Sequence, residues 1–242
     1  MESLYTGSFK RWIIDDADGE SLSGCAQYPA FFRRLLWQRG VVSAEDAERY
    51  LAPDICHLHD PFLMKGMDKA AARIVRAIER QESVLVYGDY DVDGVSATAI
   101  LIRFLRSAGL NPEFYIPDRV EEGYGISDAS MDVVCASGYN LMITVDCGIT
   151  AREQTDTIQK RCLDGGKPLD IIVTDHHQCQ EDLVPQVLAI LNPHLPDCGY
   201  PFKYLCGAGI ALKLVQAAGD GGGGVLNFTP PEALKILQAA EQ

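Results

Sequence analysis

Three short apolar runs that end in acidic or imidazole side chains constrain this 242-residue chain more than any other feature. Each run is rich in β-branched and other apolar residues, which is typical of a buried strand. The polar segments that follow the runs are Asp89-Tyr90-Asp91-Val92-Asp93, Asp146-Cys147 and Asp175-His176-His177. Because parallel strands end at one edge of a sheet, we expect these side chains to meet there.

From residue 83 onward, strand and helix patterns alternate. Near-continuous apolar strands separated by helices predict an α/β fold with a parallel sheet of about five strands flanked by helices. The predicted strands span residues 83–89, 112–117, 140–146, 170–175 and 187–192. The predicted helices span residues 94–108, 127–137, 150–162 and 207–218. We expect Gly94 to open the first of these helices, and Ser127 and Thr150 to cap the next two.

Three regions are expected along the chain. Residues 1–82 are predicted to form a helical N-terminal lead-in, in which Ser43 caps one helix and residues 67–80 form another. Residues 83–218 form the predicted sheet domain. Residues 219–242 are predicted to be a glycine-rich linker followed, from Pro231, by the start of a further helix.

The net charge of −13 argues against a broad basic surface for nucleic acid, although a local groove could still bind it. No apolar run reaches the ~18 residues of a membrane span, and the first residues lack the pattern of a signal peptide. None of the eight cysteines belongs to a C-x-x-C pair. We therefore expect a reduced, cytoplasmic protein rather than a disulfide-stabilised one.

The three alternating carboxylates suggest a metal site. In an extended strand, Asp89, Asp91 and Asp93 would face one side. Burying three carboxylates without cations is very costly, and bridging cations remove that cost. A polar loop at a strand end is the plainer alternative. A calcium loop is a weaker one, because its twelfth position, counted from Asp89, is Ile100 rather than glutamate.

The other two polar segments add weaker signals at the same strand-end position. Asp146 alone could be a simple cap. The adjacent residues His176 and His177 would point to opposite sides of an extended chain, so one could bind metal while the other contacts a substrate phosphate. Asp175 could orient one of these imidazoles. A metal site for phosphoryl chemistry is therefore the leading interpretation, with a surface histidine pair as the alternative.

The remaining candidates are weaker still. His57, His59 and His194 are each expected to be structural. The glycines of residues 221–224 are not followed by Lys-Ser/Thr, so the phosphate-loop pattern fails and a linker is favoured. Cys147 has no organised histidine partner in the sequence, so we interpret it as a packing residue rather than a nucleophile.

Taken together, these segments resemble the DHH phosphoesterase superfamily, whose name-giving motif is matched by Asp175-His176-His177. Within it, the chain resembles the branch of 5′→3′ exonucleases specific for single-stranded DNA, over about residues 30–218. The matching motifs are Gly88-Asp89-Tyr90-Asp91-Val92-Asp93-Gly94, Pro117-Asp118-Arg119, Gly123-Tyr124-Gly125, Val145-Asp146-Cys147-Gly148-Ile149, Thr174-Asp175-His176-His177, Asn192-Pro193, Cys206-Gly207-Ala208-Gly209 and, in the lead-in, Leu51-Ala52-Pro53 and Asp60-Pro61-Phe62.

The resemblance implies two Mn²⁺ or Mg²⁺ ions and two-metal hydrolysis of a phosphodiester. It places metal ligands at Asp89, Asp91, Asp93, Asp146 and His176. Asp146 would bridge the ions, and His177 would contact the phosphate and share in catalysis. Arg119 and Tyr124 match a segment along the substrate groove. Single-stranded DNA is the implied substrate, DNA repair and recombination are the implied processes, and other replication or repair proteins are candidate partners.

The family's further ligand aspartate and its second domain have no match before Gln242, so we expect a fragment with low activity by itself. Two other functions stay open. A small-substrate DHH enzyme, such as an oligoribonuclease, a nucleotide phosphatase or a pyrophosphatase, would share the metal chemistry. The resemblance argues against a pyrophosphatase, because that family carries a histidine at the position of Asp89. A non-catalytic scaffold would have lost ligands that this chain keeps.

Overall fold

A computed structural model describes residues 3–7, 10–14 and 25–220 of the chain. The chain divides into two compact units, Met1–Leu58 and His59–Gln242. The sequence predicts a boundary at residue 82 instead. The structural boundary lies earlier because the helix Met67–Arg80 (α3) packs into the core of the sheet domain. The linker and the helix predicted beyond residue 220 lie outside the described residues.

The unit Met1–Leu58 begins with two strands, so the predicted helical lead-in is helical only in its later part. β1 (Ser3–Gly7) and β2 (Lys10–Ile14) form an antiparallel pair in which Ser3 lies opposite Ile14. Both segments contain aromatic and β-branched residues, which favour strands over helices. The helical prediction gave these local preferences too little weight.

Two helices follow in the same unit, as predicted. α1 (Ala30–Trp37) and α2 (Ala44–Leu51) accompany a small core of Cys25, Leu36, Val41 and Ala47. The Ser43 hydroxyl oxygen accepts a hydrogen bond from the Asp46 amide at 3.0 Å, so the predicted cap of α2 is confirmed. A short 3₁₀ turn, η2 (Ile55–His57), comes next.

A five-stranded parallel sheet forms the centre of the second unit, as the sequence predicts. Its strands lie in the order β4-β3-β5-β6-β7. They are β3 (Val84–Gly88), β4 (Glu113–Tyr115), β5 (Leu141–Val145), β6 (Asp170–Thr174) and β7 (Ala189–Leu191). Gly88 pairs with Val145, and Val145 pairs with Thr174. The polar segments that follow these three residues therefore emerge side by side at one edge of the sheet.

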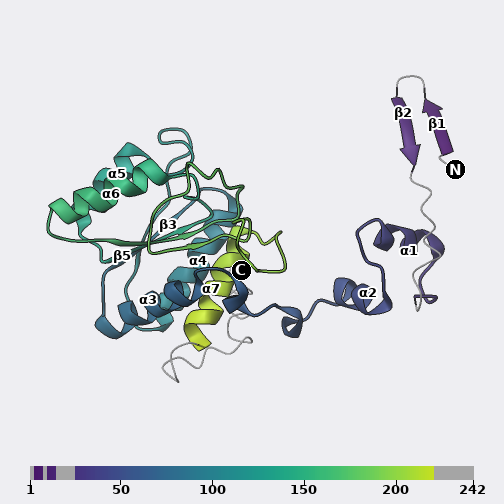
Figure 1. Ribbon diagram of the computed structural model, residues 1–242, viewed down its shortest axis with the longest axis horizontal. Helices are drawn as coiled ribbons and strands as arrows, with labels where there is room; N and C mark the ends of the chain where they lie inside the picture. The colour runs from purple at the N-terminus through teal and green to yellow at the C-terminus, as the bar shows by residue number, and fades with distance from the viewer. Residues whose placement is uncertain (1–2, 8–9, 15–24, 221–242) are drawn as a thin grey trace. The chain divides into compact units, whose positions relative to one another are not determined.

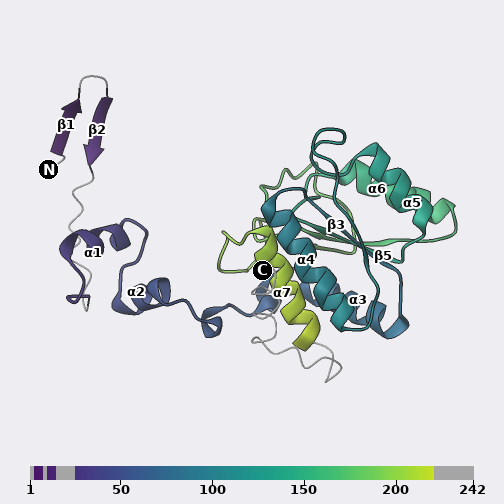
Figure 2. The same cartoon turned by 180° about the vertical axis from the view of Figure 1, so that it is seen from behind.

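Helices cover both faces of this sheet (Figure 1). α3, α4 (Val92–Ser107) and α7 (Gly207–Asp220) lie on one face, and α5 (Asp128–Ser137) and α6 (Arg152–Asp164) lie on the other. The view from behind shows α7 running alongside α4 (Figure 2). A 3₁₀ turn, η3 (Pro61–Leu63), precedes α3.

Each face of the sheet has its own apolar core. Val86 and Ile143 belong to the core beneath α3, α4 and α7. Their neighbours Leu85 and Met142 belong to the core beneath α5 and α6. Successive residues of a strand point to opposite faces, so a sheet buried on both sides needs apolar residues at every position. That requirement explains the continuous apolar runs in the sequence.

Two helix starts differ from the prediction. α4 begins at Val92 rather than Gly94, because Asp91 Oδ1 accepts hydrogen bonds from the amides of Asp93 and Gly94 at 2.9 and 3.0 Å. α6 begins at Arg152 and has no side-chain cap, so the predicted cap at Thr150 is wrong. The turn before α6 is closed by a hydrogen bond from the Ala151 amide to the Gly148 carbonyl oxygen at 3.0 Å. Ser127 caps α5 as predicted.

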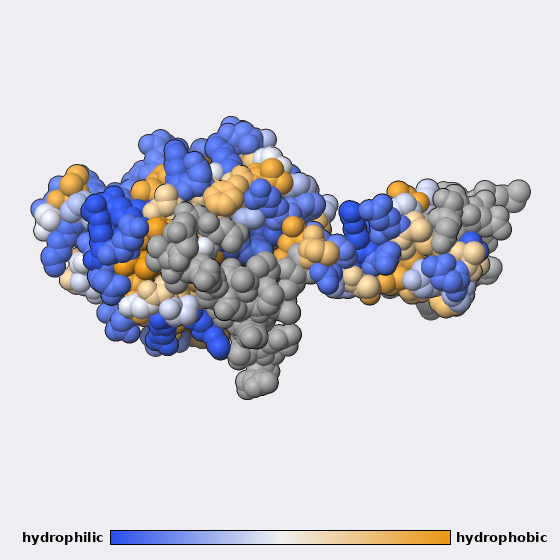
Figure 3. Space-filling view, turned by 90° about the horizontal axis from the view of Figure 1, so that it is seen from below, coloured by the Kyte–Doolittle hydropathy of each residue, from blue (hydrophilic) through white to orange (hydrophobic). Residues whose placement is uncertain are grey.

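The surface of the second unit is mixed in character. On the face shown in Figure 3, hydrophilic residues cover most of this unit and apolar residues form small separate patches. Scattered apolar residues of this kind are ordinary on a globular domain. Within the part of the chain that the structure describes, no helix combines the length and apolarity needed to cross a membrane.

Candidate metal centre

The end of β3 and the start of α4 carry the first three carboxylates. Asp89 follows the strand directly and is 4% exposed, and its Oδ1 atom has no hydrogen-bond partner. Asp91 caps α4, and Asp93 lies in the first helical turn. The three carboxylates are therefore brought together by a strand-to-helix turn. They do not alternate along an extended strand, as the sequence suggests. The turn is tight, since a Cβ atom at Gly94 would lie 2.5 Å from the carbonyl oxygen of Asp89.

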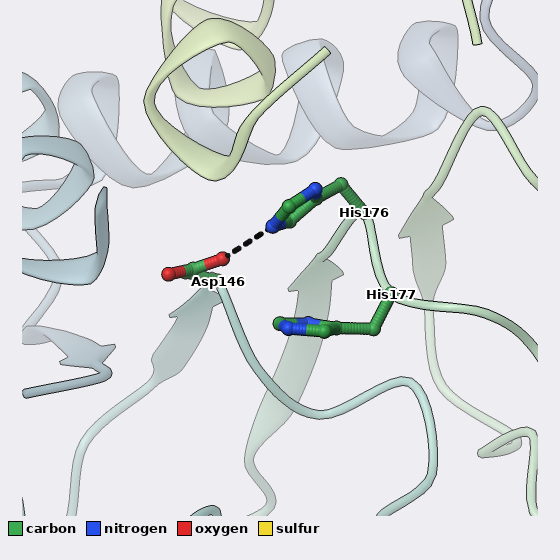
Figure 4. Close-up of side chains that lie close together, drawn as sticks. All are labelled: Asp146, His176 and His177. Atoms are coloured by element: carbon green, nitrogen blue, oxygen red, sulfur yellow. Dashed lines mark ion pairs between the residues drawn. The ribbon is translucent and has the colours of Figure 1, made fainter. Parts of the chain in front are cut away.

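Asp146 follows β5, near the middle of the same edge. Its φ is +61°, a left-handed conformation that aspartate adopts more readily than most residues. The side chain is 1% exposed, and its Oδ1 atom lies 3.0 Å from His176 Nε2 (Figure 4). Gly207 approaches so closely that a Cβ atom there would lie 2.8 Å from Asp146 Oδ1. The carboxylate is thus enclosed between β5 and the start of α7.

Asp93 connects the site to α7. Its Oδ2 atom accepts a hydrogen bond from the Gly207 amide at 2.6 Å, and its Oδ1 atom accepts one from the Ala208 amide at 2.8 Å. Oδ2 also lies 3.5 Å from His176 Nε2. Free amides at the start of a helix stabilise a negative charge. Asp93 is therefore satisfied by backbone donors, unlike Asp89 and Asp146.

Asp175 is fully buried and holds the histidine pair in place. Its Oδ1 atom accepts hydrogen bonds from the amides of His176 and His177 at 2.7 and 3.0 Å, and His177 Nδ1 lies 2.7 Å from the same oxygen. Its Oδ2 atom accepts a hydrogen bond from the Ile149 amide at 2.9 Å. Asp175 therefore orients His177, while the ring of His176 points toward Asp146 (Figure 4).

The carboxylates of the site oppose one another's ionisation. Burial, followed by the charges of Asp93 and Asp91, raises the pKa of Asp146 to about 8. Burial also raises the pKa of Asp89. The hydrogen bond from the Gly94 amide lowers the pKa of Asp91. Clustered carboxylates with raised pKa values are typical of a site built around positive charge.

The histidine pair has the opposite balance. The hydrogen bond to Asp175 raises the pKa of His177, which favours its protonated form. Burial acts to raise the pKa of Asp175, but hydrogen bonds from the His177 ring, the His177 amide and the Ile149 amide outweigh it and lower that pKa. A protonated imidazole can donate to a phosphate, whereas a metal ligand must be unprotonated. These contacts favour a phosphate-binding role for His177.

The residues present fit a pair of divalent cations. Two groups place possible ligand atoms within 4.8 Å of one another: Asp89, Asp91 and Asp146 form one, and Asp146, His176 and His177 form the other. Asp146 belongs to both groups, as a bridging ligand would. Carboxylate oxygens suit Mg²⁺ and Mn²⁺, and imidazole is also a common transition-metal ligand. The role of each residue as a ligand stays a prediction.

The two predicted groove residues lie in the loop between β4 and α5. Tyr124 Oη lies 3.2 Å from His177 Nδ1 and donates a hydrogen bond to the Asp146 carbonyl oxygen at 3.3 Å. The Arg119 guanidinium lies over the ring of Tyr90, 5.4 Å from its centroid. The structure thus brings Tyr124 into the site and places Arg119 beside the turn that carries Asp89.

Residues expected to be structural have local explanations. His57 Nδ1 accepts a hydrogen bond from the Asp54 amide at 3.2 Å. The ring of His59 packs edge-on against Tyr200. Cys147 is fully buried, and burial raises the pKa of its thiol, so it packs rather than acting as a nucleophile.

Sequence reasoning misses the roles of two residues that shape the site. Gly207 leaves room for Asp146, but a glycine in an apolar segment does not show what it faces. Asn192 donates a hydrogen bond from Nδ2 to the His177 carbonyl oxygen at 3.0 Å and accepts one from the His194 amide at 2.8 Å. The Asn-Pro pair is visible in the sequence, yet only the fold shows that it supports His177.

The fold and this cluster together define a parallel α/β domain with a candidate metal centre at the carboxyl ends of its strands. The sequence profile of the DHH family, N-terminal domain, matches residues 83–240. Because this match covers more than half of the chain, the chain belongs to the DHH family.

The most similar curated relatives include RecJ proteins. The single-stranded-DNA-specific exonuclease RecJ of Bacillus subtilis strain 168 is 40% identical over 210 residues, which are 86% of this chain and 26% of that relative. The protein of the same name from Escherichia coli K12 is 37% identical over 193 residues, which are 79% of this chain and 32% of that relative. The chain therefore spans about a quarter to a third of the length of these relatives.

Solved structures show the same similarity. A crystal structure of exonuclease RecJ bound to manganese matches with a TM-score of 0.61 and 35% identity, covering 72% of this chain and 42% of that one. RecJ from Thermus thermophilus in complex with Mn²⁺ matches with a TM-score of 0.67 and 28% identity, covering 91% of this chain and 29% of that one. These similarities confirm the resemblance predicted from the motifs, to exonucleases specific for single-stranded DNA.

Proposed function

We propose that this site hydrolyses phosphodiester bonds with bound Mn²⁺ or Mg²⁺. We further propose that the protein expressed from its complete coding sequence is a 5′→3′ exonuclease acting on single-stranded DNA. The observation that carries the proposal is a pair of buried carboxylate oxygens: among the described residues, Asp89 Oδ1 has no hydrogen-bond partner, and Asp146 Oδ1 accepts no hydrogen bond and faces the His176 ring, at 3.0 Å. Unpaired buried oxygens of this kind are costly unless a cation occupies the site.

In this proposal, two ions are held by Asp89, Asp91, Asp93, Asp146 and His176, with Asp146 shared between them. When bound, the ions activate a water molecule as the nucleophile and stabilise negative charge on the phosphodiester. The chain itself supplies preorganisation. Amides of α4 fix Asp91 and amides of α7 fix Asp93, so these carboxylates keep their places without a bound cation.

His177 contacts the scissile or neighbouring phosphate in this proposal. Asp175 engages its Nδ1 atom and favours the protonated ring, so Nε2 is the nitrogen that can donate to a phosphate oxygen. Tyr124 lies beside the ring of His177. Arg119 lies earlier in the same loop, where its guanidinium can pair with the DNA backbone.

Similarity to RecJ supports the substrate. Relatives from two bacteria carry the name single-stranded-DNA-specific exonuclease. The net charge of −13 gives little non-specific attraction to DNA, so the strand is expected to bind in a local groove rather than over a broad surface. We also propose a cytoplasmic location, a role in DNA repair and recombination, and contacts with other replication or repair proteins.

The test uses the protein expressed from its complete coding sequence and oligonucleotides labelled at either end. Mononucleotides should be released from the 5′ end of single strands in Mn²⁺, with no release in EDTA and little from matched duplex. Equal cutting of both substrates, or of neither, would contradict the proposal. Cleavage of short oligonucleotides or pyrophosphate without action on long DNA would favour a small-substrate enzyme. Calorimetry showing no tight Mn²⁺ binding would favour a scaffold.

A further inference from the structure

The loop of residues 116–127, between β4 and α5, carries one wall of the site but has little regular structure of its own. Tyr124, at its far end, touches His177 and Asp146. The glycines on either side of Tyr124 have φ values of +77° and +84°, which most residues avoid. Glycines leave the backbone free to adopt many conformations. Something must therefore hold this loop in the one conformation that presents Tyr124.

Glu122 supplies that restraint through one carboxylate. Its Oε2 atom accepts hydrogen bonds from the hydroxyls of Tyr115 at 2.8 Å and Ser127 at 2.6 Å. Its Oε1 atom accepts one from the Asp118 amide at 2.9 Å. Tyr115 ends β4, Asp118 lies in the first turn of the loop, and Ser127 caps α5. The carboxylate thus ties the end of β4, the first turn of the loop and the last residue of the loop to one point.

Neighbouring contacts make this anchor rigid. The ring of Tyr115 stacks on Tyr87, with centroids 5.3 Å apart and planes 13° from parallel. The Tyr87 hydroxyl donates to the Gly125 carbonyl oxygen at 2.9 Å, next to Tyr124. Tyr87 is itself fully buried in the sheet. The hydrogen bond from Ser127 lowers the pKa of Glu122, so this residue is a carboxylate at neutral pH and accepts these bonds as an anion.

We infer that Glu122 is a positioning residue, whose carboxylate holds the 116–127 loop so that Tyr124 stands against His177 and Arg119 lies over Tyr90. No atom of Glu122 hydrogen-bonds a site carboxylate or histidine among the described residues. It therefore acts through the loop and not on the reacting groups. The consequence for catalysis rests on the proposed function, whereas the consequence for the loop does not.

Limited proteolysis measures the loop directly in the chain as it stands. Arg119 is exposed within the loop, so trypsin can cleave after it once the loop opens. Glu122→Ala should speed cleavage there about 10-fold or more, because opening then costs fewer hydrogen bonds. Glu122→Gln should give an intermediate rate, since its single side-chain oxygen can still accept from the Tyr115 and Ser127 hydroxyls, but its NH2 group then faces the Asp118 amide and cannot accept from it. Glu121→Ala, which changes the exposed neighbour, should cleave like the parent chain.

Two further readouts connect the loop to the site. NMR signals of the His177 ring should shift in Glu122→Ala in the direction that they shift in Tyr124→Phe, and should stay near the parent values in Glu121→Ala. In the protein from the complete coding sequence, Glu122→Ala should lower kcat/KM on single-stranded DNA about 10–100-fold, because a small displacement of a positioning group has effects of that size. Glu122→Gln should recover most of that loss.

The outcomes separate the two proposals. Unchanged proteolysis and an unchanged His177 signal in Glu122→Ala would overturn the inference, whether or not the protein cuts DNA. Faster proteolysis with full activity in an active protein would overturn it as well. A protein that opens its loop and shifts His177, but never hydrolyses DNA even as the parent, would support the positioning role and contradict the proposed function. Thermal unfolding shows whether each variant keeps its fold.

Discussion

The two edges of one sheet handle buried charge in opposite ways. At the edge where the strands begin, Arg73 of α3 is 5% exposed and is surrounded by acceptors. Its guanidinium contacts Asp170 Oδ2 at 2.6 Å, Glu82 Oε2 at 2.7 Å and the Asn140 carbonyl oxygen at 3.1 Å. These groups precede β3, β5 and β6 or begin them. With Arg76 3.8 Å from Glu82, positive and negative charges are balanced there, and the network joins α3 to the sheet.

At the edge where the strands end, the balance is missing. Asp89, Asp91, Asp93 and Asp146 gather there, and among the described residues no lysine or arginine forms an ion pair with them. Within the described ranges, the ion pairs at this edge involve His176 with Asp93 and Asp146, and His177 with Asp175. Asp89 and Asp146 are buried within this cluster, and like charges gathered in this way lower stability unless a ligand compensates them. The paired charges at one edge therefore suit stability, whereas the unpaired carboxylates at the other suit a bound cation.

The largest expected effect is at the binding edge. Asp146→Asn keeps the shape and the left-handed backbone but removes the charge shared by both ligand groups. Loss of an outer partner of a metal ligand typically costs about 10–100-fold, so loss of this residue should lower hydrolysis of single-stranded DNA by more than about 100-fold. Initial rates at saturating Mn²⁺ provide the measurement. His194→Ala serves as the control and should keep most of the activity.

A rate for Asp146→Asn close to that of the parent would contradict this contrast between the two edges. It would mean that the carboxylate cluster is not the metal centre.

The balancing edge should respond in stability rather than in activity. Arg73→Met leaves Asp170 without its cationic partner and Glu82 with only the more distant Arg76, and breaking a buried network in this way should reduce the free energy of unfolding by about 3 kcal/mol. Arg76→Met is the matched control, because Arg76 lies on the same helix and approaches Glu82 at 3.8 Å with its side chain half exposed. Urea unfolding should show a change of less than about 0.5 kcal/mol for this control. Equal losses would remove the distinction between buried and exposed pairs.

Gly207→Ala tests how closely α7 closes on the binding edge. Its new methyl group would lie 2.8 Å from Asp146 Oδ1, so the carboxylate or the helix must move. Mn²⁺ affinity, measured by calorimetry, should fall about 10-fold, since overpacking commonly costs roughly 1–3 kcal/mol. Gly209→Ala is the control two residues along α7, where the nearest atom is the flexible Leu205 Cδ2 at 3.1 Å. Similar affinities for both variants would show that the approach of Gly207 is unimportant.

The smallest expected effect is a pH dependence of the metal-free chain. The pKa of Asp146 is about 8 in the folded chain, against an ordinary value of 3.8. The folded state therefore binds the proton of the Asp146 carboxyl more tightly than the unfolded state does. The stability that this proton contributes is lost as pH rises through about 8. In EDTA, the free energy of unfolding should fall between about pH 5.5 and 8 in the parent, and by less in Asp146→Asn. Excess Mn²⁺ should reverse the trend. Parallel pH curves for parent and variant would contradict this assignment.

The sequence was sufficient for the sheet, because a strand buried on both faces must be apolar at every position. That requirement makes β3, β5 and β6 visible as uninterrupted runs, and their polar ends mark one edge. The helix of residues 67–80 and the cap at Ser43 follow from equally local rules. The first residues were harder, because their preference for strands is weak and short range. The start of α6 was missed because backbone hydrogen bonds, rather than Thr150, close its turn.

The local pattern of the chain was enough to predict which aspartates and histidines reach the candidate site, since each of them follows a strand by one to five positions. Their different contacts within the site depend on the packing of distant elements. Asp93 accepts hydrogen bonds from α7 amides more than a hundred positions later. Asp175 contacts the ring of His177, whereas the ring of His176 faces Asp146 Oδ1. Contacts between distant segments depend on packing that no local pattern encodes, because a side chain's partners are set by the distance between folded elements and not by spacing along the chain.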